Sequence, residues 1–195
     1  MKLKYYFSII IFLLFAHKSF SQYYFGGNIG FGYSNHSLAE VGNVYFESQG
    51  QTTFWKIFTG YQLDFFGMEV SYRDNGTLKV ENPTYYFNYY NRGIDVMGFG
   101  RFQWKRFNLK GKAGAFYSNT TTNFVVKKTL PSQNNRVQLT KYSNDANETH
   151  FIYGVSLGIH LIRSIQFQIE YENIYLEEEQ LSSLSFGLTY LLSKK

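Results

Sequence analysis

Ile165-Gln166-Phe167-Gln168-Ile169-Glu170-Tyr171-Glu172 decides the fold of this chain, because large apolar residues and polar residues alternate strictly along it. Leu184-Ser185-Phe186-Gly187-Leu188-Thr189-Tyr190 repeats the alternation near the C-terminus. A period of two predicts β-strands with one apolar and one polar face. Further segments of the same kind occupy most of the chain, so we expect an all-β protein. Strands of soluble β-sandwiches show the same alternation of apolar and polar residues. Other features must therefore decide whether the apolar face meets lipid or a protein core.

The N-terminus has the features of an export signal. Lys2 and Lys4 precede an apolar run from Ser8 to Ala16, and small residues then stand at Ser19 and Ser21. This pattern predicts a secretory signal peptide over residues 1–21, cleaved before Gln22. A retained membrane helix is the alternative, but the apolar run is shorter than the roughly 20 residues that span a bilayer.

Composition favours a membrane barrel over a soluble domain. Phenylalanine, tyrosine and tryptophan make up 21% of the residues, a content that two aromatic girdles at the membrane interfaces would absorb. There is no cysteine, which excludes disulfides and thiolate metal sites. Loss of the predicted signal peptide removes three lysines and no acid, lowering the formal charge from +5 to about +2. A charge this small gives no reason to expect nucleic acid as a partner.

The mature chain, residues 22–195, divides into eight alternating segments and leaves no second domain. Each is close to the roughly 9–11 residues that a tilted membrane strand needs. We therefore predict an eight-stranded antiparallel up-and-down transmembrane β-barrel. The expected strands are Tyr23–Tyr33, Phe54–Leu63, Phe66–Arg73, Gly93–Phe102, Phe107–Ser118, His150–Leu161, Ile165–Tyr175 and Leu181–Leu192.

The expected connections differ in length. Asp64-Phe65, Gln103–Arg106 and Ile162–Ser164 are tight turns, and a short link joins the last two strands. Three long polar loops are expected at Ser34–Thr53, Asp74–Arg92 and Asn119–Thr149. In outer-membrane barrels the tight turns face the periplasm and the long loops face outward.

Strand parity assigns the charged residues to the lumen. An eight-stranded barrel is only wide enough for side chains to fill, and buried charges must be paired. We expect Arg73 near Asp95, Glu69 near Arg101 and Glu170 within reach of Lys112, so that the lumen is plugged by ion pairs. A proton or ion path is the alternative. The predicted polar network of the lumen is Lys56, Glu69, Arg73, Asp95, Arg101, Lys110, Lys112, Glu170 and Glu172.

The second long loop carries an unusual run of aromatic residues. Large amphipathic rings interleaved with asparagine are typical of contact surfaces. The same rings could instead extend the hairpin above the membrane and pair across it, which is the interpretation we favour. The candidate contact surface consists of Tyr85, Tyr86, Phe87, Tyr89 and Tyr90.

No catalytic, metal or cofactor site is predicted. HExxH, paired His and Cys spacings and calcium-loop patterns are absent from the sequence. One enzymatic alternative is an outer-leaflet lipid-modifying activity, which would need His36 and Asp74 to converge beside an activated hydroxyl.

Two stretches carry a resemblance to a known family. The hairpin from Gly60-Tyr61-Gln62 to Gly67-Met68-Glu69-Val70-Ser71-Tyr72 resembles the second hairpin of small Gram-negative outer-membrane β-barrels, the group that includes the OmpX/Ail type and the membrane domain of OmpA. The ending Ser185-x-Gly187-x-x-Tyr190-x-Leu192 is similar to the signal that the barrel-assembly machinery recognises in a last strand.

The resemblance implies residence in the outer membrane of a Gram-negative bacterium. Expected partners are outer-membrane lipid and lipopolysaccharide, the barrel-assembly machinery during biogenesis, and a protein bound through the extracellular loops. Because such barrels serve many roles, the expected function is the general one of a non-enzymatic barrel that mediates surface interaction or supports the envelope.

Overall fold

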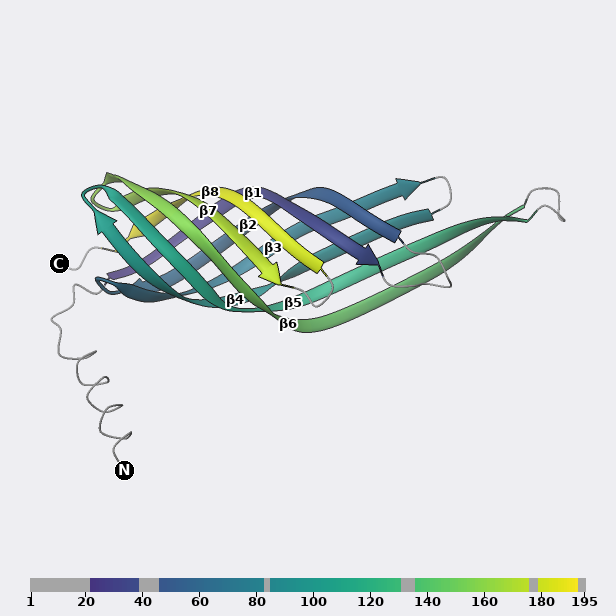
Figure 1. Ribbon diagram of the computed structural model, residues 1–195, viewed down its shortest axis with the longest axis horizontal. Helices are drawn as coiled ribbons and strands as arrows, with labels where there is room; N and C mark the ends of the chain where they lie inside the picture. Colours follow the sequence, from purple (N-terminus) through teal and green to yellow (C-terminus); the bar gives the residue numbers. More distant parts are fainter. Residues whose placement is uncertain (1–21, 39–45, 83–84, 131–135, 176–178, 193–195) are drawn as a thin grey trace, which may run out of the picture.

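The computed structural model describes residues 22–38, 46–82, 85–130, 136–175 and 179–192, which form a closed barrel of eight antiparallel strands (Figure 1). Each strand pairs with its sequence neighbours, and β1 pairs with β8 to close the ring. Within these residues no helix is long and apolar enough to cross a membrane. The strands are β1 (Gln22–Leu38), β2 (Phe46–Gln62), β3 (Phe66–Asn82), β4 (Tyr85–Trp104), β5 (Phe107–Leu130), β6 (Arg136–Ile162), β7 (Ile165–Tyr175) and β8 (Glu179–Leu191).

The predicted fold class is confirmed, including the number of strands and their up-and-down order. The bounds of β7 match the prediction, and the tight turns lie where they were expected. Leu63 N–H donates to Phe66 O at 2.8 Å across the first turn, and Leu192 N–H donates to Tyr23 O at 2.8 Å. The first residues of β1 and the last of β8 therefore lie side by side, at the end of the barrel that carries the tight turns. The predicted signal peptide lies outside the described residues.

The long polar loops were predicted wrongly, because most of their residues continue the strands. The register between β5 and β6 runs without a break from Phe107↔Ile159 to Leu130↔Arg136. Polar residues without alternation can pair in this way because backbone hydrogen bonds, and not side-chain burial, hold a hairpin above the membrane. In Figure 1 the β5–β6 hairpin reaches farthest from the turn end of the barrel.

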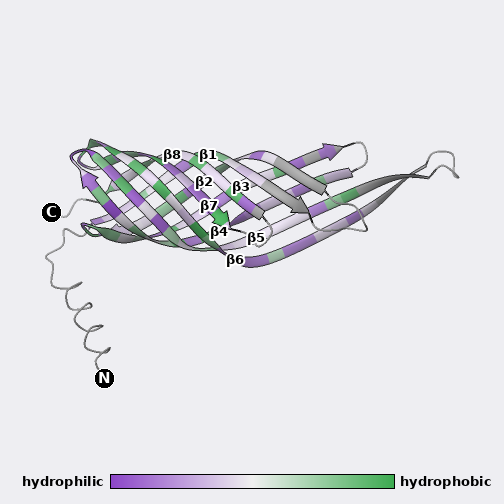
Figure 2. Ribbon diagram, in the orientation of Figure 1, coloured by the Kyte–Doolittle hydropathy of each residue, from purple (hydrophilic) through white to green (hydrophobic). Residues whose placement is uncertain are grey.

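Hydrophobic and hydrophilic residues alternate along the strands of the barrel wall (Figure 2). Apolar side chains predicted to face lipid point outward and are exposed, with Ile29 at 71%. The register sets aromatic pairs near the two ends of this band: Tyr23 packs on Tyr61 at the turn end, and Trp55 packs on Tyr72 toward the other end. This surface is what a hydrocarbon solvent requires, since every backbone polar group in the band is paired within the closed sheet.

Beyond this band the wall divides into two separate sheets. β3 pairs with β4 up to Asn82↔Tyr85, and this pairing continues through β5 to β6. On the other edge of β3, the pairing with β2 ends earlier, at Trp55↔Asp74. The outer parts of β3, β4, β5 and β6 therefore form one continuous sheet beyond the apolar band. We call it the protruding sheet.

Candidate functional site

The centre of the lumen holds a network of buried ion pairs from strands on opposite walls. Arg73 on β3 donates from Nε to Asp95 Oδ2 of β4 at 2.7 Å and from Nη2 to Glu172 Oε2 of β7 at 2.6 Å. Lys56 Nζ on β2 lies 2.9 Å from the other oxygen of Glu172. Ser71 Oγ donates to Asp95 at 2.5 Å, so both oxygens of that carboxylate are engaged.

A second carboxylate layer lies closer to the turn end. Lys112 Nζ on β5 is 2.8 Å from Glu69 Oε1 and 2.5 Å from Glu170 Oε2. Lys56 bonds the remaining oxygen of Glu170, which joins the two layers into one network. The hydroxyl of Tyr24 donates to Glu69 Oε2 at 2.8 Å. Each of these charged side chains is buried, so the whole array is closed to bulk water.

Lys110 and Arg101 stand apart from the network. Lys110 Nζ lies over the rings of Tyr24 and Phe99, 4.5 Å and 4.7 Å from their centroids, so aromatic faces stabilise this cation. The predicted approach of Glu69 to Arg101 is wrong. Arg101 lies at the mouth of the barrel and bonds Gln103, because the register sets Glu69 opposite Met97, four residues from Arg101 along β4.

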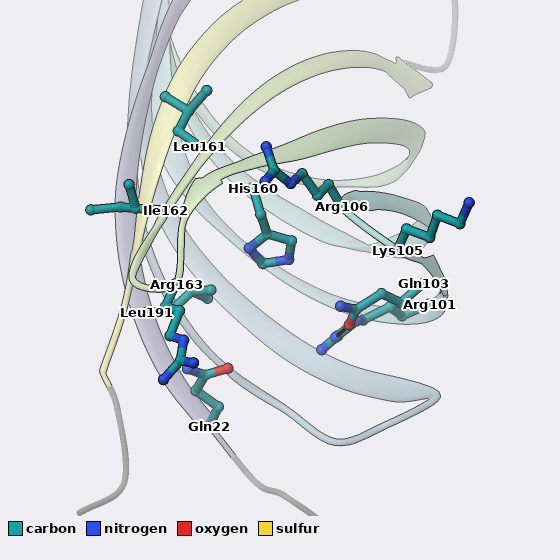
Figure 3. Close-up of a pocket in the computed structure, with 10 residues that line it drawn as sticks. All are labelled: Gln22, Arg101, Gln103, Lys105, Arg106, His160, Leu161, Ile162, Arg163 and Leu191. Carbon is teal, nitrogen blue, oxygen red and sulfur yellow. Dashed lines mark hydrogen bonds between the residues drawn. The ribbon is translucent and has the colours of Figure 1, made fainter.

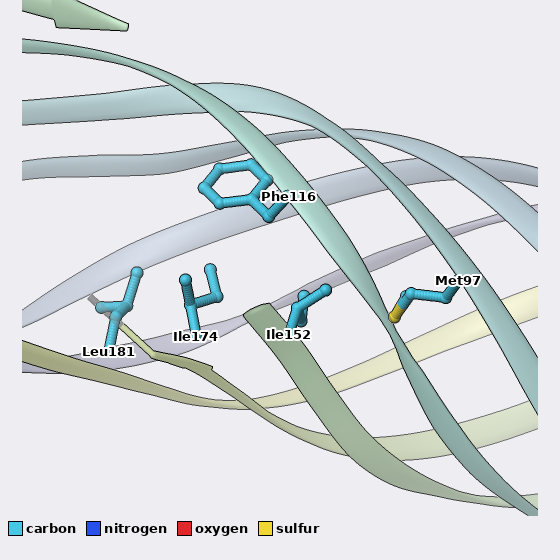
Figure 4. Close-up of a cluster of buried hydrophobic side chains, with 5 residues drawn as sticks. All are labelled: Met97, Phe116, Ile152, Ile174 and Leu181. Atoms are coloured by element: carbon cyan, nitrogen blue, oxygen red, sulfur yellow. The ribbon is translucent and has the colours of Figure 1, made fainter. Parts of the chain in front are cut away.

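Sequence reasoning missed two apolar layers inside the lumen. Toward the turn end, the ion pairs meet a layer formed by Tyr24, Phe58, Phe99 and Leu191. On their other side, Met97, Phe116, Ile152, Ile174 and Leu181 pack together (Figure 4). The same strand parity that assigned the charges also points these residues inward, so the signal was present in the sequence.

The charged side chains at the centre of the lumen are buried, and most of them are paired. The lumen buries four cations and four carboxylates, and all but Lys110 take part in ion pairs: Lys56, Arg73 and Lys112 with Glu69, Asp95, Glu170 and Glu172. Removing one partner from such a pair leaves an uncompensated buried charge, at a cost of about 3–5 kcal/mol. Aromatic and aliphatic side chains cap the network at both ends. Chemically the array is a buried set of charges with equal numbers of each sign.

The aromatic run of the second expected loop belongs to the protruding sheet. Phe87 is buried at 1% exposure and packs with Leu78 and Phe124, with Tyr85 and Tyr89 against the same cluster. This packing removes Phe87 from contact with any partner. The hydroxyl of Tyr90 donates to Asp74 Oδ2 at 2.7 Å, across the bulge in the β3–β4 pairing. The hydrogen bond to Asp74 and partial burial raise the pKa of the Tyr90 phenol.

The residues named for the enzymatic alternative are not brought together. The backbone of His36 pairs opposite Ser48 of β2, whereas Asp74 pairs opposite Trp55 of the same strand. Seven residues along a strand correspond to about 23 Å. Asp74 is also already engaged, since it accepts from Tyr90 and from Gly76 N–H at 2.9 Å.

A different serine and histidine do meet, at the outer end of the lumen. Ser118 Oγ lies 3.0 Å from His150 Nε2, and Glu148 Oε2 is 3.5 Å from the same nitrogen. A catalytic triad needs the carboxylate on the opposite ring nitrogen from the nucleophile. Ser118 is also fully buried, so a substrate has no route to it. No cluster of three or more metal-ligating side chains occurs within the described ranges.

Comparisons with known proteins agree with this geometry. The model of the family described as OmpA-like transmembrane domain matches residues 18–181. No curated protein matches the sequence significantly. Among solved structures, the attachment invasion locus protein Ail of Yersinia pestis matches with a TM-score of 0.55 at 14% identity, covering 87% of this chain and 98% of that one. Neisserial surface protein A matches with a TM-score of 0.57 at 12% identity, covering 86% and 96%.

Proposed function

The chain belongs to the OmpA-like transmembrane domain family and is an outer-membrane β-barrel, and on that premise we propose that it is a non-enzymatic surface-interaction protein. The proposal has two parts. The barrel body is a closed anchor that conducts nothing, and the protruding sheet binds a partner outside the cell. We also propose that the protein is exported by a cleaved signal peptide and folded by the barrel-assembly machinery. In the membrane it would contact outer-membrane lipid and lipopolysaccharide.

The closed body is supported by the contents of the lumen. Lys56, Lys112 and Arg73 reach across the interior to carboxylates on other strands, and apolar layers lie above and below them. Aqueous channels need about twice as many strands to leave space at the centre. A conducting path would have to break several buried pairs at once, each at a cost of several kcal/mol.

The binding role is carried by one observation, the unpaired edge of β6 in the protruding sheet. β6 pairs with β5 from Arg136 to Ile159, but its pairing with β7 begins only at Phe151. Among the described residues, no strand covers the other edge of β6 from Arg136 to Thr149. The side chains from Thr140 to Thr149 are mostly exposed, with Tyr142 at 50%.

An exposed strand edge is a template for strand addition. Its free N–H and C=O groups can bond an extended polypeptide, and side chains along the edge then select the sequence. Lys141, Asp145 and Glu148 place both signs of charge along this edge, which disfavours indiscriminate edge-to-edge association. The proposed partner is therefore an extended polypeptide segment of another protein.

A photocrosslinking experiment tests the binding role. A photoreactive phenylalanine analogue replaces Asn144 on the free edge or, as the control, Val155 on the lipid face of the same strand. Irradiation of native membranes should give a discrete protein adduct from position 144 and none from position 155. Replacing residues 123–143 by Asn-Gly joins the register partners Thr122 and Asn144 through a two-residue turn and should abolish the adduct. Equal adducts from both positions, or adducts with lipopolysaccharide alone, contradict the proposal.

A further inference from the structure

The turn end of the barrel contains a cleft of about 630 Å³ that the proposed function does not use (Figure 3). Its walls come from the beginning of β1, the ends of β4, β6 and β8, and the turns after β4 and β6. Figure 3 shows His160 in the middle of the group, with Arg106 on one side and Arg101 and Gln103 across from it. The lining residues are Gln22, Arg101, Gln103, Lys105, Arg106, His160, Leu161, Ile162, Arg163 and Leu191.

The cleft is strongly basic. Four of its ten lining residues are lysine or arginine, a fifth is histidine, and none is acidic. Three cations come from different walls: Arg101 on β4, Arg106 in the β4–β5 turn and Arg163 in the β6–β7 turn. Like charges gathered around one space repel each other, so the arrangement is stabilised when an anion enters.

Two nitrogens within this group lack a hydrogen-bond partner, and that of Arg101 is always a donor. Nε of Arg101 and Nε2 of His160 are buried atoms, and neither makes a hydrogen bond in the structure. Buried polar atoms usually find a partner, and an orphan donor beside a basic cleft fits an anionic oxygen. The backbone of the site is already fixed, since His160 N–H donates to Arg106 O at 2.8 Å and ties the turn to β6.

The inner end of the cleft is closed. Leu191 lines the cleft and belongs to the apolar layer with Tyr24, Phe58 and Phe99, which separates the cleft from the ion pairs of the lumen. A ligand must therefore enter and leave by the same mouth. The space is larger than inorganic phosphate needs and falls within the ordinary range of small-molecule sites.

We propose that this cleft binds a phosphate ester through Arg101, Arg106 and Arg163. Arginine suits this chemistry because its planar fork donates two parallel hydrogen bonds to phosphate oxygens. The phosphate can belong to a soluble periplasmic ester or to the headgroup of an anionic phospholipid in the inner leaflet. Both sources offer the same group to the same donors. The site is independent of the free β6 edge, so either proposal can fail without the other.

The test uses the mature protein in phosphatidylcholine nanodiscs, with glycerol 3-phosphate as the soluble probe. Calorimetry should give saturable binding of one equivalent. The double variant Arg106→Gln/Arg163→Gln should weaken it at least tenfold, the order expected for loss of a charge-assisted hydrogen bond. Arg92→Gln is the matched control, because this exposed arginine lies beside Tyr90 at the other end of the barrel and should leave affinity unchanged.

A second arm distinguishes the source of the phosphate. Nanodiscs containing phosphatidylglycerol should shift the NMR resonances of His160 if a lipid headgroup occupies the cleft, and the double variant should remove the shift. Saturable binding of the soluble ester supports a periplasmic ligand, and a headgroup shift without it supports the lipid. Absence of both, or equal responses from the double variant and the wild type, overturns the proposal. A folded barrel on heat-modifiable electrophoresis shows that the variant is intact.

Discussion

Arg73 on β3 donates from Nη2 to Glu172 on β7 at 2.6 Å, across the full width of the lumen. Three strands lie between β3 and β7 in either direction around the ring, so the two side chains come from opposite walls. The pair joins residues 99 positions apart in the chain. It ties the two halves of the barrel together from the inside, in addition to the hydrogen bonds that hold the wall.

The lumen pairs should dominate the stability of the barrel body. Glu170→Ala removes a carboxylate that Lys112 and Lys56 share. Glu69 and Glu172 remain beside these lysines, but the lumen is left with one uncompensated buried positive charge, which should cost about 3–5 kcal/mol of unfolding free energy. Ile169→Ala trims a side chain that is 36% exposed on the outer face and should cost on the order of 1–2 kcal/mol. Urea unfolding in lipid vesicles ranks the two variants. A larger loss from Ile169→Ala would show that this strand faces the other way.

The folded barrel should conduct essentially no ions. The cross-lumen pairs of Lys56 and Arg73 fill the centre, and the layer containing Phe99 closes the side nearer the turns. Recordings from pure monomer in planar bilayers should stay silent between pH 5 and 8. Reproducible steps of large conductance are the result that would rule out the closed body.

The aromatic cluster should hold the protruding sheet together. Phe87→Ala empties a site between Leu78 and Phe124, and truncating a buried phenylalanine costs about 3 kcal/mol or more. Faster amide exchange should therefore appear in the outer parts of β3 and β4 while the barrel body stays protected. Tyr86→Ala, which changes a partly exposed side chain on the other face, is the control and should have little effect. Equal exchange in both variants argues against the cluster.

Tyr90 should titrate above the ordinary value for tyrosine. Its hydrogen bond to Asp74 raises the pKa of the phenol above 10.0, so the fold favours the neutral form. The stabilising contribution is complete below pH 10.0 and is lost as the pH rises through the raised pKa. NMR of ¹³C-labelled tyrosine should show the Tyr90 midpoint falling in Asp74→Asn and staying unchanged in Asp64→Asn. An unchanged midpoint in Asp74→Asn would mean that the hydrogen bond is not maintained in solution.

The mature protein should begin at Gln22. Ser19 and Ser21 provide the pair of small residues that signal peptidase requires after the apolar run. Intact-mass spectrometry of protein purified from outer membranes measures the terminus directly. Recovery of a chain that starts at Met1 would contradict the predicted cleavage.

The sequence alone was enough to predict the number of strands, their order and the two faces of the wall. The period of two is a local property of one strand. It assigns Ile169 and Glu170 to opposite faces of the wall without reference to any neighbouring strand. The length of the protruding sheet was not predictable in this way. Residues such as Asn144 lie in a part of the strand that contacts neither lipid nor a packed lumen. Nothing there selects for alternating apolar and polar residues, so the sequence does not reveal the strand.

The sequence already indicated Arg73 beside Asp95 and Glu170 beside Lys112, whereas only the tertiary structure decided the partners of Glu69 and Arg101. Parity sends Glu69, Arg101 and Lys112 into the lumen, but it does not say at what height each stands. The register of tilted strands sets those heights, placing Lys112 rather than Arg101 beside Glu69. The same closure gathers basic residues from separate turns around one cleft, although nothing in the sequence near Arg106 points to Arg163. Faces follow from the period of one strand, whereas pairing across a lumen follows from how eight strands close.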